Sequence, residues 1–328
     1  MAAGKLAAVF RHASAFTAAV LFCGVLSWVG AIPVALLPFV FLVAVYCATG
    51  RTWLGGLATA SVVLIVGFVT LGTETAFFCG LFVLSGVALG SGIRREAAFG
   101  TVVTVVTVWL CGVFAGYLAF HMTWSGWERQ AAGWYEAVLA ETREVAGNAK
   151  EQEAAYDFLQ WIFVEHWADV SMGLIFASFL MCAVLATGAA ATWVRSRHGL
   201  AGLRTTFAKM RPPEWLVWPA IGCAVLWFVE QRIPNDALRA ISWNAAIGIA
   251  AVYWLNGLSI LVYALRHLRL HVFVVIALLV FMMYAGAWIL SFVGLFDTWW
   301  EFRAKVDHLV AVRDKLREGD GNGDGNNE

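Results

Sequence analysis

The amino-acid sequence predicts an all-α integral membrane protein, a polytopic bundle of about nine transmembrane helices with an amphipathic helical hairpin on its outer side. The first observation is compositional, since 61% of the 328 residues are hydrophobic and only 13% are charged. A soluble domain carries about twice that charged fraction. The second is a series of long apolar runs, and the third is the placement of lysine and arginine in alternate loops between them.

A transmembrane helix needs roughly 20 apolar residues, because a rise of about 1.5 Å per residue must cover roughly 30 Å of hydrocarbon. The second of the predicted spans contains Pro33 and Pro38 and the seventh is short, so these two could be tilted, kinked or partly re-entrant. Residues 1–121 hold five spans and residues 170–295 hold four: Ser14 to Ala31, Pro33 to Thr49, Leu54 to Gly72, Thr75 to Gly92, Ala98 to Phe120, Val170 to Trp193, Trp215 to Val229, Ala240 to Ala264 and Val272 to Leu295.

The positions of the basic residues predict the orientation of these spans. Lysine and arginine concentrate in the cytoplasmic loops of membrane proteins. With a cytoplasmic N-terminus, the inner segments hold Lys5, Arg11, Arg51, Arg94, Arg95, Arg195, Arg197, Arg204, Lys209, Arg211, Arg266 and Arg269, whereas the outer loops hold Arg129, Arg143, Lys150, Arg232 and Arg239. The sequence therefore predicts a multi-pass protein of the cytoplasmic membrane.

Three segments lie outside the predicted spans. Residues 122–169 contain eight acidic and three basic residues before Asp169, with apolar residues at helical spacing, and predict the outer hairpin. It could be a lid over an outward pocket or an ordinary amphipathic surface helix. Residues 296–317 predict an amphipathic C-terminal helix, and residues 318–328 a disordered polar tail.

Ionisable residues at the ends of spans are the candidate ligand-binding groups, because such residues are rare there. Glu74 lies in the outer turn between the third and fourth spans, and Glu165, His166 and Asp169 cluster where the sixth begins. Glu165 and Asp169 are four residues apart and share a helix face. These residues could line an outward-facing polar pocket, or each could be an ordinary interfacial carboxylate in water.

Asn256 places a polar amide in the otherwise apolar eighth span, where it either bridges helices or faces a ligand. The sequence lacks the HExxH, GxSxG, GxxxxGK[ST] and GxGxxG motifs, so no catalytic residue, metal site or cofactor is predicted and an enzyme is disfavoured without being excluded. Balanced charges, with 22 basic and 22 acidic residues, argue against a nucleic-acid partner.

Five segments resemble the YybS-like family of predicted bacterial membrane proteins, domain of unknown function 2232. They are the Pro33 and Pro38 hairpin, Gly86 to Arg95 (GVALGSGIRR), Phe207 to Trp215 (FAKMRPPEW), Tyr253 to Gly257 (YWLNG) and Gly294 to Arg303 (GLFDTWWEFR). The family pattern often has glutamine where this chain has Asn256. The resemblance implies that the first six helices are similar to the substrate-capture subunits of energy-coupling-factor vitamin transporters.

In those subunits a small-residue motif on the first helix docks the coupling subunit, and Ala15 and Ala19 are the positions that match here. Gly112 and Gly116 also have small-xxx-small spacing, which favours close packing between helices of the chain, with partner docking as the alternative. The three helices beyond the first six depart from the pattern of those subunits.

Two functions are expected. The first is a small-solute binding or transport-associated subunit that works in the lipid bilayer with coupling and ATPase subunits, with Glu74, Glu165, His166, Asp169 and Asn256 as the ligand-binding residues. The alternative is a non-catalytic scaffold or assembly protein that contacts envelope proteins.

Overall fold

Every regular element is a helix in the part of the chain that the computed structural model describes. That part comprises residues 73–121, 166–198, 202–233, 235–268 and 287–321 and single residues 44, 45, 48, 126, 129, 133, 136, 160 and 277. It divides into two compact units. The first comprises Met1–Arg204 and Cys223–Gly248, and the second comprises Thr205–Gly222 and Ile249–Glu328.

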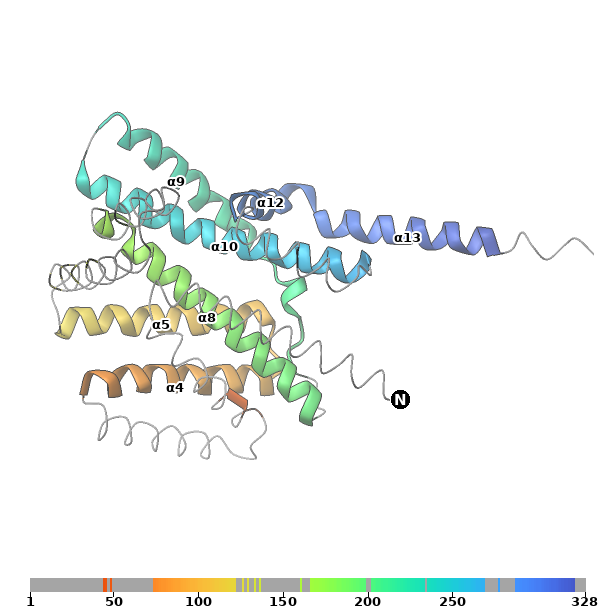
Figure 1. Ribbon diagram of the computed structural model, residues 1–328, viewed down its shortest axis with the longest axis horizontal. Helices are drawn as coiled ribbons and strands as arrows, with labels where there is room; N and C mark the ends of the chain where they lie inside the picture. Colours follow the sequence, from red (N-terminus) through yellow and green to blue (C-terminus); the bar gives the residue numbers. More distant parts are fainter. Residues whose placement is uncertain are drawn as a thin grey trace, which may run out of the picture. The chain divides into compact units, whose positions relative to one another are not determined.

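The described helices are shown in Figure 1. Three of them are long and apolar enough to cross a membrane, over Phe99–Gly116, Asp169–Arg197 and Asp236–His267. Their bounds are as follows: α4 (Thr73–Arg94), α5 (Phe99–His121), α8 (Trp167–His198), α9 (Val217–Glu230), α10 (Asp236–Leu268), α12 (Ala287–Trp300) and α13 (Phe302–Gly321), with the short 3-10 helices η2 (Phe207–Lys209) and η3 (Glu214–Leu216).

In the first unit, α4, α5 and α8 pack as antiparallel neighbours along the chain (Figure 1). The turn between α4 and α5 is tight: Glu96 has a φ of 52°, and Ala97 N–H donates to Gly92 O at 3.0 Å. Farther along, Phe114 of α5 packs edge-on against Phe179 of α8, with ring centroids 5.8 Å apart. Arg204 N–H donates to Ala97 O at 3.1 Å, so the loops that follow α4 and α8 lie at the same end of this unit.

The first turns of α10 also belong to the first unit and run alongside α8. Asn244 Oδ1 accepts a hydrogen bond from Gly173 N–H at 2.7 Å, and a Cβ on Gly173 would lie 2.7 Å from Asn244 O. Farther along both helices, Gly248 approaches Phe176. Because both partners advance together along the chain, α8 and this part of α10 run in the same direction, as expected for two spans separated by one intervening span.

In the second unit, α10 and α12 cross at two glycines. A Cβ on Gly257 would lie 2.0 Å from Leu290 O, and a Cβ on Gly294 would lie 1.9 Å from Tyr253 O. Ser291 Oγ donates to Ala250 O at 3.2 Å next to this crossing. Only glycine permits such an approach, because any larger residue would place its Cβ inside the van der Waals radius of a backbone oxygen.

The Gly112 and Gly116 pair makes no close approach to the part of the chain that the structure describes. A Cβ added to either glycine would meet no described atom within 4 Å. Both glycines are on α5, and Gly112 is exposed. Among the described glycines, close approaches occur instead at Gly92, Gly173, Gly257 and Gly294. Spacing alone did not separate the two cases, because it does not say which face of a helix meets a neighbour.

The C-terminal helix runs along the last turns of α10. Arg303 contacts Ser259 and Asp307 contacts Tyr263, so the chain from Arg303 onward advances toward the C-terminal end of α10. The span expected at Val272 to Leu295 is described only at residue 277 and from residue 287 onward, so the nine-span topology stays a prediction.

Two helix boundaries also differ from the predicted ones. Helix α12 continues to Trp300 and α13 begins at Phe302, whereas the C-terminal helix was expected from residue 296. The break is at Glu301, which has a φ of 45°. The predicted spans before residue 73, apart from residues 44, 45 and 48, lie outside the described residues, as does most of the outer hairpin.

Candidate functional site

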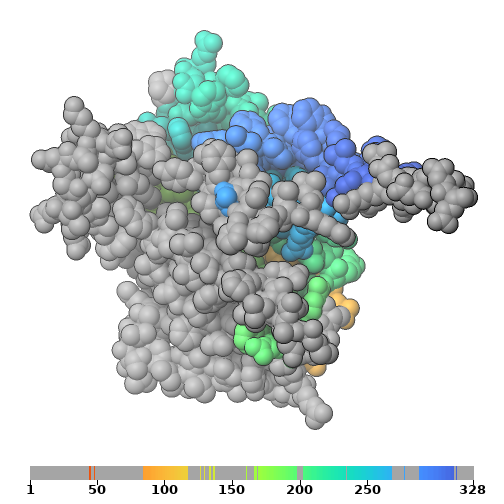
Figure 2. Space-filling model, turned by 45° about the vertical axis from the view of Figure 1, so that its right-hand side comes forward, coloured from red at the N-terminus to blue at the C-terminus, as the bar shows by residue number. Residues whose placement is uncertain are grey.

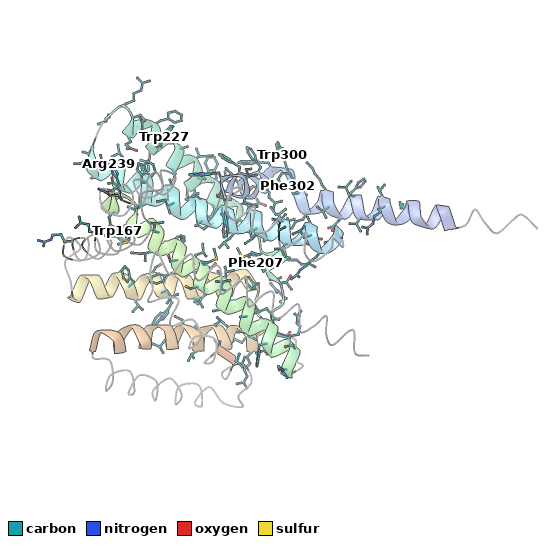
Figure 3. The ribbon with its side chains drawn as sticks, in the orientation of Figure 1. Trp167, Phe207, Trp227, Arg239, Trp300 and Phe302 are labelled. Atoms are coloured by element: carbon teal, nitrogen blue, oxygen red, sulfur yellow. The ribbon has the colours of Figure 1, made fainter. Side chains whose placement is uncertain are left out.

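A buried polar network lies where α12 gives way to α13. Asp297, in the last turn of α12, accepts a hydrogen bond from Phe302 N–H at 2.9 Å through Oδ1 and so caps the first turn of α13. Its other oxygen, Oδ2, pairs with Arg303 Nη1 at 2.5 Å. Asp297 is 6% exposed and Arg303 is 4% exposed. The labelled Trp300 and Phe302 flank this break in Figure 3.

Arg303 also donates to groups from two distant segments of the second unit. Its Nε donates to Ala208 O in η2 at 3.2 Å, and its Nη2 donates to Met210 O, just after η2, at 2.8 Å. The same Nη2 donates to Asn256 Oδ1 at 3.2 Å and to Ser259 Oγ, both on α10. The planar guanidinium thus uses its fork of donors to bind several acceptors at once, which a lysine ammonium on a flexible stem is not shaped to do.

The α10 residues of the network have partners of their own. Asn256 Nδ2 donates to Gly294 O at 2.8 Å, and Ser259 Oγ donates to Asn256 O at 2.8 Å. Asn256 is 1% exposed and Ser259 is fully buried. The amide of Asn256 therefore bridges α10 to α12 and to Arg303, which is the bridging alternative of its two expected roles.

Burial lowers the pKa of Arg303, because desolvation disfavours its charged form, while the nearby Asp297 carboxylate acts in the opposite direction. An arginine still remains protonated at any ordinary pH. The network is therefore a fixed, charge-balanced structure. It offers no group with the reactivity of a nucleophile, acid or base.

Helix α13 stays beside α10 beyond this network. Tyr263 O–H donates to Asp307 Oδ1 at 2.5 Å, and Arg313 Nη1 approaches His267 O at 3.5 Å. The contacts from Arg303 to Ser259, Asp307 to Tyr263 and Arg313 to His267 advance together along both helices. Helix α13 thus runs parallel to the last turns of α10 and continues past its end (Figure 1).

Three of the segments that resemble a known family meet at Arg303. The Phe207 to Trp215 segment supplies the carbonyls of Ala208 and Met210, and Tyr253 to Gly257 supplies Asn256. The Gly294 to Arg303 segment supplies Gly294, Asp297 and Arg303 itself. A family model described as predicted membrane protein, DUF2232, matches residues 14–298.

The chain belongs to this family. The DUF2232 match contains the network residues from Ala208 to Asp297, whereas Phe302 and Arg303 lie beyond its last matched residue, 298. No curated protein and no solved structure matches the chain. The DUF2232 family is described as predicted membrane proteins, and this description assigns no activity. The similarity to substrate-capture subunits stays a prediction.

A second polar cluster lies in the first unit, where α8 and α10 begin. Asp169 is 6% exposed, and its Oδ2 lies 3.0 Å from His166 Nδ1 and accepts a hydrogen bond from Arg239 Nε at 2.7 Å. Arg239 also pairs with the exposed Asp236 at 3.1 Å. Arg239 and Trp167 are labelled at this end of the two helices in Figure 3.

The structure thus brings together two of the outer candidates, His166 and Asp169, and adds Arg239. Glu165 and the side chain of Glu74 lie outside the described part, although the backbone of Glu74 is in the first turn of α4. Among the described residues no group of three His, Cys, Asp or Glu side chains could hold a metal ion. The charge of Asp169 is already balanced by Arg239.

Sequence reasoning selected Asn256 and missed Arg303, Asp297 and Ser259. The available signal was an aspartate and an arginine six residues apart, at the end of an apolar run and inside a family-like segment. That signal does not reveal the pairing, because the other acceptors for Arg303 are backbone carbonyls far earlier in the chain.

Proposed function

We propose that this DUF2232 protein is a non-catalytic membrane protein that docks another protein through its C-terminal helix α13. The observation that carries the proposal is the burial of Arg303 in a network that joins α13 to α10, α12 and the segment at η2. Burying a guanidinium costs several kcal/mol unless it is paired and fully hydrogen-bonded. A buried network of this kind fixes the direction of the helix that starts from it.

Helix α13 extends beyond this network with exposed apolar side chains. Leu309 is 66% exposed and Val312 is 42% exposed. A helix that served only to cover α10 would direct its apolar residues toward α10. Fixing the start of a helix while leaving an apolar face free is the arrangement expected of a docking element.

The experiment compares the full chain with a chain that ends after His308. The shorter chain keeps Arg303 and Asp307 and therefore the contacts that fix the start of α13. Both are expressed in native membranes, cross-linked and purified in parallel. The proposal expects proteins that are recovered with the full chain to be lost from the shorter one. Recovery of the same proteins with both chains would contradict it.

The cluster at Asp169 favours a second candidate function, capture of a small solute at the predicted outer side together with coupling and ATPase subunits. The observation is that His166 and Arg239 remain partly exposed, at 30% and 39%, beside the buried Asp169 carboxylate. A hydrogen-bonding solute could contact both side chains.

Thermal stabilisation of the purified protein by a panel of vitamins and metal ions tests this candidate. If the protein captures a solute, one compound should raise the Tm of the protein, and this increase in Tm should disappear in the Asp169→Asn variant. The absence of any shift across the panel would contradict it.

A further inference from the structure

On α13, basic and acidic side chains lie mostly on different faces, and this distribution indicates the chemistry of a partner. One side of α13 faces α10 through Arg303, Asp307 and Arg313. At about 100° per residue, Lys305, Leu309 and Val312 fall within about 60° of one another on a different face. In the sequence, Leu316 continues the same spacing.

Basic side chains accompany this apolar stripe. Lys305, His308 and Lys315 are exposed. Lys305 lies within the stripe, and its Nζ is 5.7 Å from the ring centre of Trp300 and 5.6 Å from that of Phe302. His308 and Lys315 fall along one edge of the stripe by the same helical geometry.

Most of the acidic residues of α13 are elsewhere. Asp307 is bound to Tyr263 on the side toward α10, and positions 314 and 318 fall on that side by helical spacing, whereas Asp320 in the last turn falls in line with the stripe. From Lys305 to position 316, the stripe therefore presents apolar contact area bordered by positive charge. An amphipathic helix with acidic residues at its borders is complementary to it in both respects.

The direction of α13 favours a protein over a lipid surface. A basic amphipathic helix binds a membrane by lying in the plane of the interface. Helix α13 instead runs parallel to α10, one of the membrane-crossing candidates. The 33 residues of α10 extend about 50 Å, more than the roughly 30 Å of hydrocarbon, so α10 extends beyond the hydrocarbon at one end or at both.

Leu309 and Val312 are level with those last turns of α10, because they lie between Asp307 beside Tyr263 and Arg313 beside His267. The atoms of α12 and of the start of α13 are on the face shown in Figure 2. Leu309 and Val312 are exposed beside these turns of α10, so a second helix can pack along the stripe.

We propose that the face of α13 formed by Lys305, Leu309 and Val312 binds an amphipathic helix with acidic borders from a different protein. This inference rests on the proposed docking function and adds the class of partner. The same face would bind a second copy of this chain poorly, because Lys305, His308 and Lys315 would meet their own counterparts.

Site-specific photo-crosslinking in native membranes tests the proposal with the full chain. A photo-crosslinking residue replaces Leu309 or Val312, and control proteins carry it at Ala304 or Ala311, which are exposed on another part of the same helix. The proposal expects protein adducts from the first two positions and few from the controls. It expects mass spectrometry to identify the attached segment as amphipathic and acidic.

A charge series completes the test. Lys305→Glu with Lys315→Glu should reduce the adducts at position 309 at least about tenfold, and Lys305→Arg with Lys315→Arg should preserve them. Adducts with lipid, adducts with this same chain, or adducts with a basic segment would each overturn the inference. If the chain ending after His308 loses its partners but the charge series has no effect, the docking function stands and the acidic partner is wrong.

Discussion

Asp297 and Arg303 stand on opposite sides of the break between α12 and α13 and form a buried ion pair, with Oδ2 and Nη1 2.5 Å apart. The aspartate also caps α13 through Phe302 N–H. One carboxylate thus neutralises the buried charge and starts the helix that carries it. The same arginine also donates to Ala208 O, Met210 O and side chains of α10, so this one side chain connects three distant parts of the sequence.

Breaking this pair from one side should destabilise the second unit strongly. Asp297→Ala leaves a buried guanidinium without its counter-charge, at a cost of about 3–5 kcal/mol. Arg303→Met should cost a similar amount, because it leaves the carboxylate and several acceptors unpaired. Denaturant unfolding in detergent of both single variants and the double variant provides a double-mutant cycle. The double variant should lose less than the sum of the singles; strict additivity would show that the two residues do not interact.

The crossing of α10 and α12 should not tolerate a methyl group. Gly257→Ala would place a Cβ 2.0 Å from Leu290 O, so the helices must separate, and we expect a loss of at least about 3 kcal/mol. Gly112→Ala in α5 is the matched control, since a Cβ there meets no atom of the described residues within 4 Å, and it should change stability by less than about 0.5 kcal/mol. Equal stability of the two variants would refute the crossing.

Asn256 offers a graded test of its bridging role. Asn256→Ala removes both the acceptor for Arg303 and the donor to Gly294 O, and should lower the free energy of unfolding by about 1–3 kcal/mol. Asn256→Gln keeps the same amide on a side chain one methylene longer and should lose less. The comparison is made by thermal unfolding, and a glutamine variant less stable than the alanine variant would contradict the account.

The C-terminal helix and the segment at η2 should be accessible from the same side of the membrane. Met210 and Arg303 are hydrogen-bonded, and both Lys209 and Lys315 are exposed. In a variant without native cysteines, Lys209→Cys and Lys315→Cys should react together with a membrane-impermeant maleimide, either before or after permeabilisation. If one cysteine reacts in intact cells and the other reacts only after permeabilisation, the two positions lie on opposite sides of the membrane. That result would contradict the expected shared side and support a single crossing by the predicted final span.

The apolar runs of the sequence predicted the helices of the described part well. The spans expected at Ala98 to Phe120, Val170 to Trp193 and Ala240 to Ala264 correspond to α5, α8 and α10. The last two helices are longer than the predicted runs, since each continues into polar residues such as Asp236 and Arg266. Hydropathy measures where a helix meets lipid, and the backbone hydrogen bonds of a helix continue into water beyond that point.

The partners of the polar residues could not be predicted in the same way. Asp169 was selected for its position at the start of a span, but its pairing with Arg239 depends on α8 and α10 lying side by side. The site of Arg303 is built from the carbonyls of Ala208 and Met210, and every residue has a carbonyl. Which carbonyls meet a guanidinium is decided by the fold.

The parallel course of α10 and α13 is the claim on which the docking function depends, and chemical cross-linking tests it most directly. Tyr263→Cys and Asp307→Cys replace a pair in contact at 2.5 Å, and a short bis-maleimide is applied to native membranes of a variant otherwise free of cysteine. The account predicts efficient intramolecular cross-linking for this pair and weak cross-linking when Ala304→Cys replaces the second partner. Equal cross-linking of the two pairs, or none at positions 263 and 307, would contradict it.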